Sequence, residues 1–278
     1  MLNRKQISKY ITPLSPIPTS LGRSSKPKKK IKAVLFDIYG TLFISEAGDI
    51  ELAGNKSQKV MQITKLLQEF GIKKSPAEIS CQLSCKIQET HAYLKKKGID
   101  FPEVKIDRLW MELLNNYDKD FIRKFAICYE LIINPVYPMP NLKKLLSAYK
   151  DSNILTGIIS NAQFFTPYLF NWFLNSSPEN IGFTPELIFY SYIYGYGKPS
   201  IFMFNMAAEK LKKIGILPES VLYLGNDMLK DIFPAQKVGF QTALFAGDKR
   251  SLRLRKSHPD CQNLTPDMVI TDLIQLKQ

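Results

Sequence analysis

The stretch FDIYGTL, from Phe36 to Leu42, is the part of the chain from which the fold is most readily inferred. It follows the run 31–36, which is apolar except for Lys32 and is typical of a buried parallel strand. Asp37 therefore stands at the carboxyl end of a buried strand, and the Gly40 turn follows it closely. A carboxylate held in that place is positioned to act as a nucleophile.

Further apolar segments predict five more strands of the same sheet, with helices between them. We expect the strands at residues 154–159, 187–190, 221–224, 242–245 and 268–270, and the helices at 141–149, 165–174, 201–214 and 228–238. Alternating strands and helices predict an α/β fold, with a Rossmann-like parallel sheet core covered by helices on both faces. In such sheets, functional groups collect at the carboxyl ends of the strands.

The region 47–135 interrupts this alternation. Helices are predicted there over residues 58–70, 76–96, 105–114 and 119–131, with little strand pattern. An all-helical insertion directly after the first strand is placed to form a cap over a site at the strand end. We therefore expect a basic flexible tail at 1–31, a core at 32–46 and 136–278, and an inserted helical cap at 47–135.

Composition and charge narrow the classes of function. The chain has 278 residues, 45% of them hydrophobic and 23% charged, as in ordinary globular proteins. Nine of the 38 Lys and Arg residues lie in residues 1–32, which hold no acid, so the rest has 29 basic and 25 acidic side chains. This near balance gives little reason to expect nucleic-acid binding.

The location of the protein is predicted from what the sequence lacks. No apolar run approaches the roughly 20 residues of a membrane-spanning helix. Residues 1–30 show no secretory signal, and the four cysteines have neither zinc spacing nor the context of a disulfide framework. We therefore expect a cytoplasmic protein that is not embedded in a membrane, and the oligomeric state stays open.

Three more polar motifs follow predicted strands or begin predicted helices. They are Ser160-Asn161, Gly197-Lys198-Pro199 and the stretch GNDMLKD at 225–231. Each also has a structural interpretation. Ser160 could be a helix N-cap, Lys198 a solvated lysine, and Asp231 an acid that favours a helix N-terminus.

Together the four motifs resemble the haloacid dehalogenase-like hydrolase superfamily, from residue 31 to 278. In the cap, the resemblance rests only on position and helical character. It implies that Asp37 attacks the substrate and becomes a covalent ester, while Ser160 and Lys198 clamp the transferring group. Thr41 and Asn161 are the implied substrate contacts.

The resemblance also implies a Mg²⁺ cofactor. Its ligands would be Asp37, the backbone carbonyl of Tyr39, Asp227 and Asp231. In another version of the fourth motif, Asn226 takes the place of the first acid. The segment 247–260 carries five basic side chains that are candidates to attract an anionic substrate. His91, Tyr93 and Arg108 are candidates to reach the site from the cap.

Tyr39 stands where phosphatases of this superfamily usually carry a second aspartate, which serves as general acid and base. A phenol with a pKa of about 10 is poorly matched to proton transfer at neutral pH. FDxYGTL followed by Ser-Asn also resembles the L-2-haloacid dehalogenases, which need no metal. Asp227 departs from that branch, in which a neutral polar residue takes this place. Without a metal, a carboxylate there would repel both Asp37 and a carboxylate substrate.

The sequence thus predicts a magnesium-dependent phosphatase that acts on a small phosphomonoester through an aspartyl-phosphate intermediate. The expected partner is a small anionic substrate. Two alternatives remain: a 2-haloacid dehalogenase-type hydrolase, and a non-catalytic protein that binds a ligand or a partner.

Overall fold

The computed structural model of the protein describes residues 2–24, 27–46 and 56–276. Six parallel strands form its main sheet, in the order β5-β4-β1-β6-β7-β8. They are β1 (Ala33–Phe36), β4 (Leu155–Ser160), β5 (Phe183–Tyr190), β6 (Val221–Gly225), β7 (Gln241–Phe245) and β8 (Met268–Ile270). This sheet confirms the predicted Rossmann-like α/β fold.

Strand β1 lies at the centre of the sheet, between β4 and β6. All four of its residues are buried, which explains its continuous apolar sequence. The register sets Phe36 beside Ile158 of β4 and Leu224 of β6. Residues that follow these three strands therefore emerge at the same edge.

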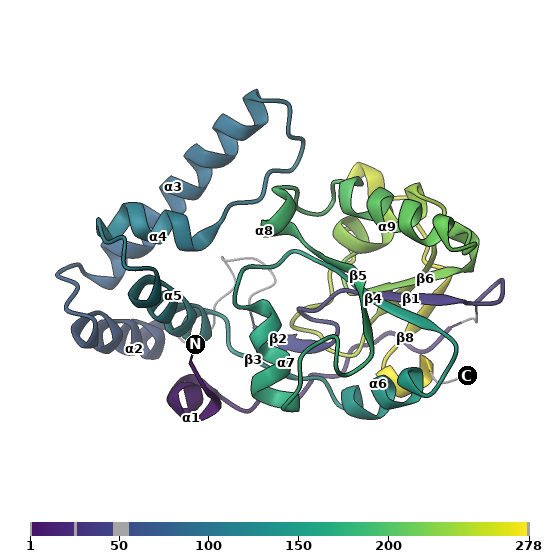
Figure 1. Cartoon of the computed structure of the whole chain (residues 1–278), viewed down its shortest axis with the longest axis horizontal. Coiled ribbons are helices and arrows are strands. Elements are labelled where there is room, and N and C mark those ends of the chain that lie inside the picture. Colours follow the sequence, from purple (N-terminus) through teal and green to yellow (C-terminus); the bar gives the residue numbers. More distant parts are fainter. Residues whose placement is uncertain (1, 25–26, 47–55, 277–278) are drawn as a thin grey trace.

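Helices cover both faces of the sheet (Figure 1). Val34 and Phe36 pack on the face of α6 (Leu142–Lys150) and α7 (Thr166–Leu174). Ala33 and Leu35, which alternate with them along β1, pack on the opposite face. That face belongs to α9 (Phe202–Lys213) and α10 (Phe233–Lys237).

The predicted helix 228–238 is irregular in its first half. A π-helix occupies Met228–Ile232, and α10 follows it. Asp227 caps the first turn, since its carboxylate accepts hydrogen bonds from the backbone of Leu229 and Lys230. Pro234 has no N–H with which to continue a regular ladder. Shorter helical elements are α8 (Ser191–Tyr194) and 3₁₀ turns at Pro218–Ser220, Pro259–Cys261 and Leu273–Leu276.

Four helices lie together beside the sheet, at the left of Figure 1. They are α2 (Lys56–Glu69), α3 (Pro76–Lys96), α4 (Ile106–Leu114) and α5 (Lys119–Ile133). We call residues 56–133 the helical region. Its core is aromatic, with Trp110 in edge contact with Phe125 and Tyr129. Residues 47–55 of the predicted cap lie outside the described residues.

A small second sheet stands between the main sheet and the helical region. It pairs β2 (Phe43–Ser45) with β3 (Val136–Pro138) in antiparallel fashion. The Ser45 hydroxyl donates to Asn134 Oδ1 at 2.8 Å, across the two connections. The two chain segments that join the helical region to the sheet are thus fastened side by side.

The N-terminal segment differs from the flexible tail that we expected. It forms α1 (Arg4–Ile7) and a 3₁₀ turn (Ser8–Tyr10), and Ile7 is fully buried. Trp172 Nε1 donates to the Leu2 carbonyl oxygen at 2.9 Å, and Ser24 forms a β-bridge with Val269. The apolar side chains of the segment find partners that its basic and proline-rich composition does not reveal.

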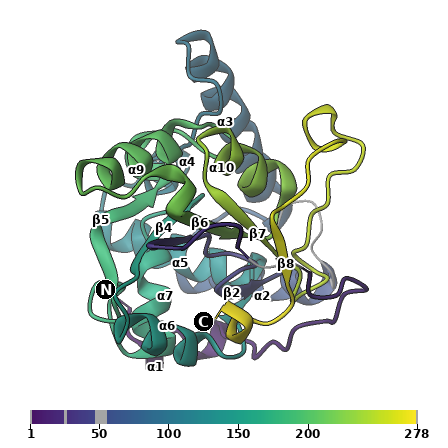
Figure 2. The same ribbon diagram turned by 90° about the vertical axis from the view of Figure 1, so that its right-hand side faces the viewer.

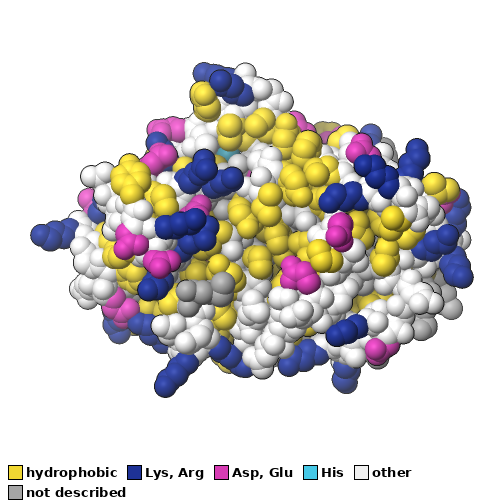
Figure 3. All heavy atoms as spheres, in the orientation of Figure 1, with side chains coloured by type: hydrophobic (Ala, Val, Ile, Leu, Met, Phe, Trp, Pro, Cys, Tyr) yellow, Lys and Arg dark blue, Asp and Glu magenta, His cyan; other side chains and the backbone are white. Residues whose placement is uncertain are grey.

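The basic side chains form no single patch on the face shown in Figure 3, where Lys and Arg are scattered between acidic and apolar groups. Figure 2 shows the sheet from a perpendicular direction, with the N-terminal segment running beside β8. Within the described ranges, no helix has both the length and the apolar composition of a membrane span.

Candidate active site

The predicted motifs meet at the carboxyl edge of the main sheet, around a cavity of about 300 Å³. Asp37 follows β1, Asn161 follows β4, and Asn226 and Asp227 follow β6. Lys198 lies in the loop after α8. The lining residues used below are Asp37, Tyr39, Glu103, Glu130, Asn161, Lys198, Asn226, Asp227, Asp231 and Arg253.

Lys198 lies at the centre of the charged groups. Its Nζ is 2.7 Å from Asp37 Oδ1 and 2.5 Å from Asp231 Oδ1, and all three side chains are almost completely buried. Burial by itself would lower the pKa of Lys198, but the two carboxylates outweigh it and raise the pKa above its usual value. The ammonium group therefore stays charged and holds one oxygen of Asp37 in place.

Asp231 is fixed from several sides. Besides Lys198, it accepts a hydrogen bond from the backbone N–H of Asp227 at 2.9 Å. The Tyr223 hydroxyl accepts from Lys198 at 3.2 Å and donates to the Ile159 carbonyl oxygen at 2.8 Å. Gly225 leaves the necessary space, since a Cβ there would lie 2.3 Å from Asp231 Cγ. Asp231 thus orients the lysine.

Asn226 and Asp227 point to different partners. Asn226 Oδ1 accepts from the Thr41 hydroxyl at 3.0 Å, and its amide donates to the Ser251 carbonyl oxygen at 2.6 Å. Asp227 instead accepts from Arg255 Nη2 at 2.8 Å. Asn226 therefore lies beside the FDIYGTL turn, whereas Asp227 is paired with the basic segment.

Two of the predicted site residues lie behind the cavity wall. Ser160 and Thr41 are fully buried, and neither is among the described residues that line the cavity. Asn161 does line it, and its side chain binds the backbone of Lys198. Its Oδ1 accepts from the Lys198 N–H at 2.6 Å, and its amide donates to the carbonyl oxygen at 3.3 Å. Asn161 thus positions the lysine loop.

The acids predicted as magnesium ligands do not form a closed metal cluster. No group of three or more His, Cys, Asp or Glu side chains in the described part of the chain is arranged to hold a metal. Within that part, Asp37 Oδ2 accepts no hydrogen bond from the protein, and it belongs to a side chain that lines the cavity. Mg²⁺ commonly takes one or two carboxylates and completes its shell with water and substrate phosphate. The candidate site fits a magnesium ion whose ligands come partly from the protein and partly from water and the substrate.

Tyr39 also lines the cavity, but its hydroxyl is engaged elsewhere. The phenol oxygen lies 2.9 Å from the hydroxyl of Thr166, the first residue of α7. Burial raises the pKa of Tyr39 well above its usual value. The phenol is therefore even less suited to proton transfer than the sequence suggests.

Two glutamates of the helical region line the cavity and were not predicted. Glu103 precedes α4, and Glu130 lies on α5. Burial raises the pKa of both carboxyls. No local pattern marks either residue, because an acid in a helical insertion is ordinarily a solvated one. Of the described residues that line the cavity, none is His91, Tyr93 or Arg108.

The segment around Glu103 docks directly on the lysine loop. Gly197 N–H donates to the Phe101 carbonyl oxygen at 2.7 Å, and Glu103 N–H donates to that of Gly195 at 2.9 Å. The Glu103 carboxylate accepts from Ser191 at 2.8 Å and from Gln163 at 3.1 Å. These bonds close one side of the cavity with residues of the helical region.

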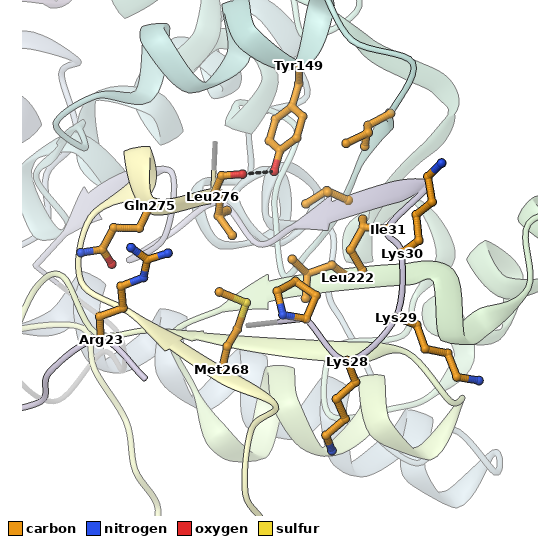
Figure 4. A pocket seen from close by; sticks show the side chains of 13 residues that line it. Arg23, Lys28, Lys29, Lys30, Ile31, Tyr149, Leu222, Met268, Gln275 and Leu276 are labelled. Atoms are coloured by element: carbon orange, nitrogen blue, oxygen red, sulfur yellow. Dashed lines mark hydrogen bonds between the residues drawn. The ribbon is translucent and has the colours of Figure 1, made fainter. Parts of the chain in front are cut away.

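A larger cavity, of about 520 Å³, lies at the opposite edge of the sheet (Figure 4). Ile31, Val34 and Leu222 form part of its wall, and Lys28 and Lys29 lie at its rim. Both lysines are paired with acids, at 2.7 Å to Asp267 and 3.6 Å to Glu219. None of the motif residues lines this cavity, so the smaller cavity is the candidate active site.

Comparisons with known proteins agree with this geometry. A family model described as haloacid dehalogenase-like hydrolase matches residues 31–239. The chain is 26% identical, over 215 residues, to glyceraldehyde 3-phosphate phosphatase of Methanocaldococcus jannaschii, covering 76% of this chain and 83% of that protein.

Two solved structures share the fold. The first is 2-haloacid dehalogenase of Pseudomonas syringae pv. Tomato, with 18% identity, a TM-score of 0.53, and coverage of 88% of this chain and 96% of that one. The second is a HAD phosphatase of Thermococcus onnurineus, with 17% identity, a TM-score of 0.50, and coverage of 89% and 96%. At these identities, the likeness concerns the fold alone.

Proposed function

Because the chain belongs to the haloacid dehalogenase-like hydrolases, we propose that it is a phosphatase that acts on a small phosphomonoester through Asp37. The observation that carries the proposal is the buried contact of Lys198 with Asp37 and Asp231. A fixed cation beside a carboxylate nucleophile offsets the repulsion between that nucleophile and an anionic phosphoryl group. The curated relative, which is named as a phosphatase, supports the same class of reaction.

In the proposed reaction, an oxygen of Asp37 attacks phosphorus and the bond to the leaving oxygen breaks. Lys198 neutralises charge on the transferring group, and Asn161 ties the lysine loop to the end of β4. Water then attacks the phosphorus of the aspartyl-phosphate, which releases phosphate and restores Asp37. The small cavity, at the lower end of the usual range for ligand sites, favours a small substrate.

We further propose that Mg²⁺ is held jointly by the protein and the substrate. Asp37, the backbone carbonyl of Tyr39 and the amide oxygen of Asn226 would hold it, with Asp227 released from Arg255 as the alternative to Asn226. When bound, the ion would neutralise phosphate charge next to the nucleophile. In this proposal the helical region acts as the cap that closes the cavity.

The test is release of phosphate from p-nitrophenyl phosphate and from small sugar and triose phosphates, with Mg²⁺ or with EDTA. We expect metal-dependent release that Asp37→Asn reduces by at least about a thousandfold, since it removes the nucleophile. The matched control is Asp151→Asn, at an exposed position outside the cavity. Unchanged release by the Asp37→Asn variant would contradict the proposal.

Tyr39 favours a second candidate, a 2-haloacid dehalogenase-type reaction, because displacement of halide from carbon needs no leaving-group proton. Chloride release from 2-chloropropionate in the presence of EDTA would establish that candidate. If the folded protein releases neither phosphate nor chloride, the remaining interpretation is a non-catalytic protein that binds a ligand or a partner.

A further inference from the structure

The proposed phosphatase lacks a proton carrier at the position that follows the nucleophile by two residues. An alkoxide is a poor leaving group unless it receives a proton, and the water of the second step must lose one. Tyr39 occupies that position, but its hydroxyl is bound to Thr166 and burial raises its pKa. A carboxyl group elsewhere in the same cavity is therefore needed if the protein itself is to carry the proton.

The two glutamates of the helical region are the candidates, and their hydrogen bonds separate them. Glu103 accepts from three donors: the Ser191 hydroxyl, the Gln163 amide and the backbone N–H of Val104. Glu103 is therefore committed to holding its segment against the sheet. A carboxyl that exchanged its proton in each cycle would have to break these bonds.

Glu130 is less constrained. Among the described residues, its carboxylate accepts one hydrogen bond, from the side-chain amide of Asn134 at 3.2 Å. It lines the cavity that contains Asp37, and it also lines a smaller adjoining space whose other walls are mostly apolar. Those walls include Ile127, Phe165, Leu169 and Trp172. This burial raises the pKa of Glu130, which lets the carboxyl hold a proton at higher pH than a solvated glutamate does.

The backbone around Glu130 keeps the carboxyl near the cavity. It lies in the last turn of α5, and Asn134 directly follows that helix. The Asn134 side chain links Glu130 to Ser45 on β2, shortly after the FDIYGTL stretch. The position of Glu130 relative to the turn after Asp37 is thus fixed by hydrogen bonds and not by packing alone.

We propose that Glu130 is the general acid and base of the reaction at Asp37, in the place that Tyr39 leaves without a proton carrier. The assignment rests on the proposed phosphatase function. In the first step, the bond from phosphorus to the leaving oxygen breaks, and that oxygen takes the proton of Glu130. In the second step, water attacks phosphorus, the bond from phosphorus to the Asp37 oxygen breaks, and the proton of the water goes to the Glu130 carboxylate, so Asp37 and Glu130 both return to their starting states.

The test compares two substrates whose leaving groups need a proton to different degrees. With enzyme in excess over substrate, the release of p-nitrophenol and of glycerol from their phosphates reports the first step in each case. p-Nitrophenol leaves readily as an anion, whereas glycerol must be protonated. Glu130→Gln should slow glycerol release by about 10²–10⁴-fold and leave p-nitrophenol release within about tenfold of wild type.

The Glu103→Gln variant is the matched control, because it removes a cavity carboxylate that is proposed to hold its segment in place. It should slow the two releases by similar factors. If Glu130→Gln also slows both equally, or neither, Glu130 is not the proton carrier although the phosphatase proposal stands. If wild-type protein releases alcohol from neither phosphate, the proposed function fails, and the assignment of Glu130 with it.

Discussion

At the scale of single residues, the site is organised around one buried cation. Lys198 Nζ lies within 2.7 Å of two carboxylates, that of Asp37 directly after β1 and that of Asp231 in the π-helix that follows β6. Such a group of charges is stable only when complete, because each member offsets the cost of burying the others. The same arrangement serves the proposed chemistry.

Replacement of this lysine should therefore damage the fold as well as the activity. Lys198→Met leaves Asp37 and Asp231 buried without their cation, and we expect it to lower the free energy of unfolding by about 3–5 kcal/mol. Urea denaturation at neutral pH measures the change. Lys144→Met, at an exposed position of α6, should stay within about 0.5 kcal/mol of wild type. Equal stability of the two variants would show that the buried charges do not depend on the lysine.

Glu130 should make the stability of the protein depend on pH with a sign opposite to that of a salt-bridged acid. Its pKa is raised above the ordinary 4.5 by burial, so over the window above 4.5 the folded protein keeps a proton that the unfolded chain has lost. The contribution of Glu130 to the free energy of unfolding is therefore complete below that window, and it is lost as the pH rises through the pKa of the folded protein. The Glu130→Gln variant has no carboxyl group there to titrate, so its free energy of unfolding relative to wild type should increase from pH 4 to pH 7.

Thermal or urea unfolding at several pH values checks this expectation. The corresponding difference for Glu209→Gln, at an exposed position of α9, should stay flat. A stability difference for Glu130→Gln that does not change with pH would mean that the Glu130 carboxyl titrates alike in the folded and unfolded chain.

At the scale of the elements, the parallel strands could be predicted because each contains an apolar segment. Strand β5 begins at Phe183, four residues before the predicted strand, because its first half carries the polar residues Thr184 and Glu186. Helix α3 was predicted with its observed bounds, since Pro76 suits the first turn and Gly98 stops the helix. In the structure, Ser75 and Glu78 add a capping box at its start. The short strands β2 and β3 were not predicted. Each has only three residues, which is too few to show a hydrophobic pattern, and the two strands lie about ninety residues apart in the chain.

The candidate site, too, has residues that could be brought together from the sequence and residues that could not. Asp37, Asn161 and the segment after β6 could be placed together because the rule of strand ends brings them to one edge, whereas Lys198 was placed there by the family resemblance of its motif. The partners of Asp227 could not, since the pairing with Arg255 depends on how the segment after β7 folds back. Glu103 and Glu130 come from the helical region, whose orientation on the sheet is set by contacts distant in sequence.

The turn from β6 into the π-helix has a steric requirement that can be tested. Gly225→Ala would place a Cβ 2.3 Å from Asp231 Cγ and push that side chain away from Lys198. We expect about 1–3 kcal/mol of destabilisation, together with a loss of activity. Gly22→Ala is the control, because a Cβ at Gly22 meets no atom within 4 Å. Wild-type stability and activity of the Gly225→Ala variant would refute this account of the turn.

At the scale of the whole molecule, the N-terminal segment connects parts that are far apart in sequence. Lys9 and Tyr10 bind Glu69 at the end of α2, while Thr19 binds the Ala246 carbonyl oxygen after β7. The segment thus runs from the helical region to the far edge of the sheet. Its composition suggested a solvated leader because lysine and proline outweigh the few apolar anchors.

Those anchors should contribute measurably to stability. Ile7 is fully buried, and Ile7→Ala should lower the free energy of unfolding by about 2–5 kcal/mol. Ile17, in the same segment, is 45% exposed, and its replacement by Ala should cost well under half as much. Tryptophan fluorescence reports the unfolding, since Trp172 lies against Leu2. Equal, small effects of both replacements would indicate a loosely held segment.

The contacts of residues 17–24 have a consequence for synthesis on the ribosome. Ile17 N–H binds the side chain of Asp248, 231 positions later, and Ser24 pairs with Val269 near the end of the sheet. Chains emerge in order of sequence, so Ile17 and Ser24 cannot make these contacts until residues 248 and 269 have been made. During translation, residues 17–24 therefore dock only after β7 and the segment that follows it have emerged. A ribosome that stalls before residue 246 would display residues 17–24 without these contacts, open to proteases and chaperones.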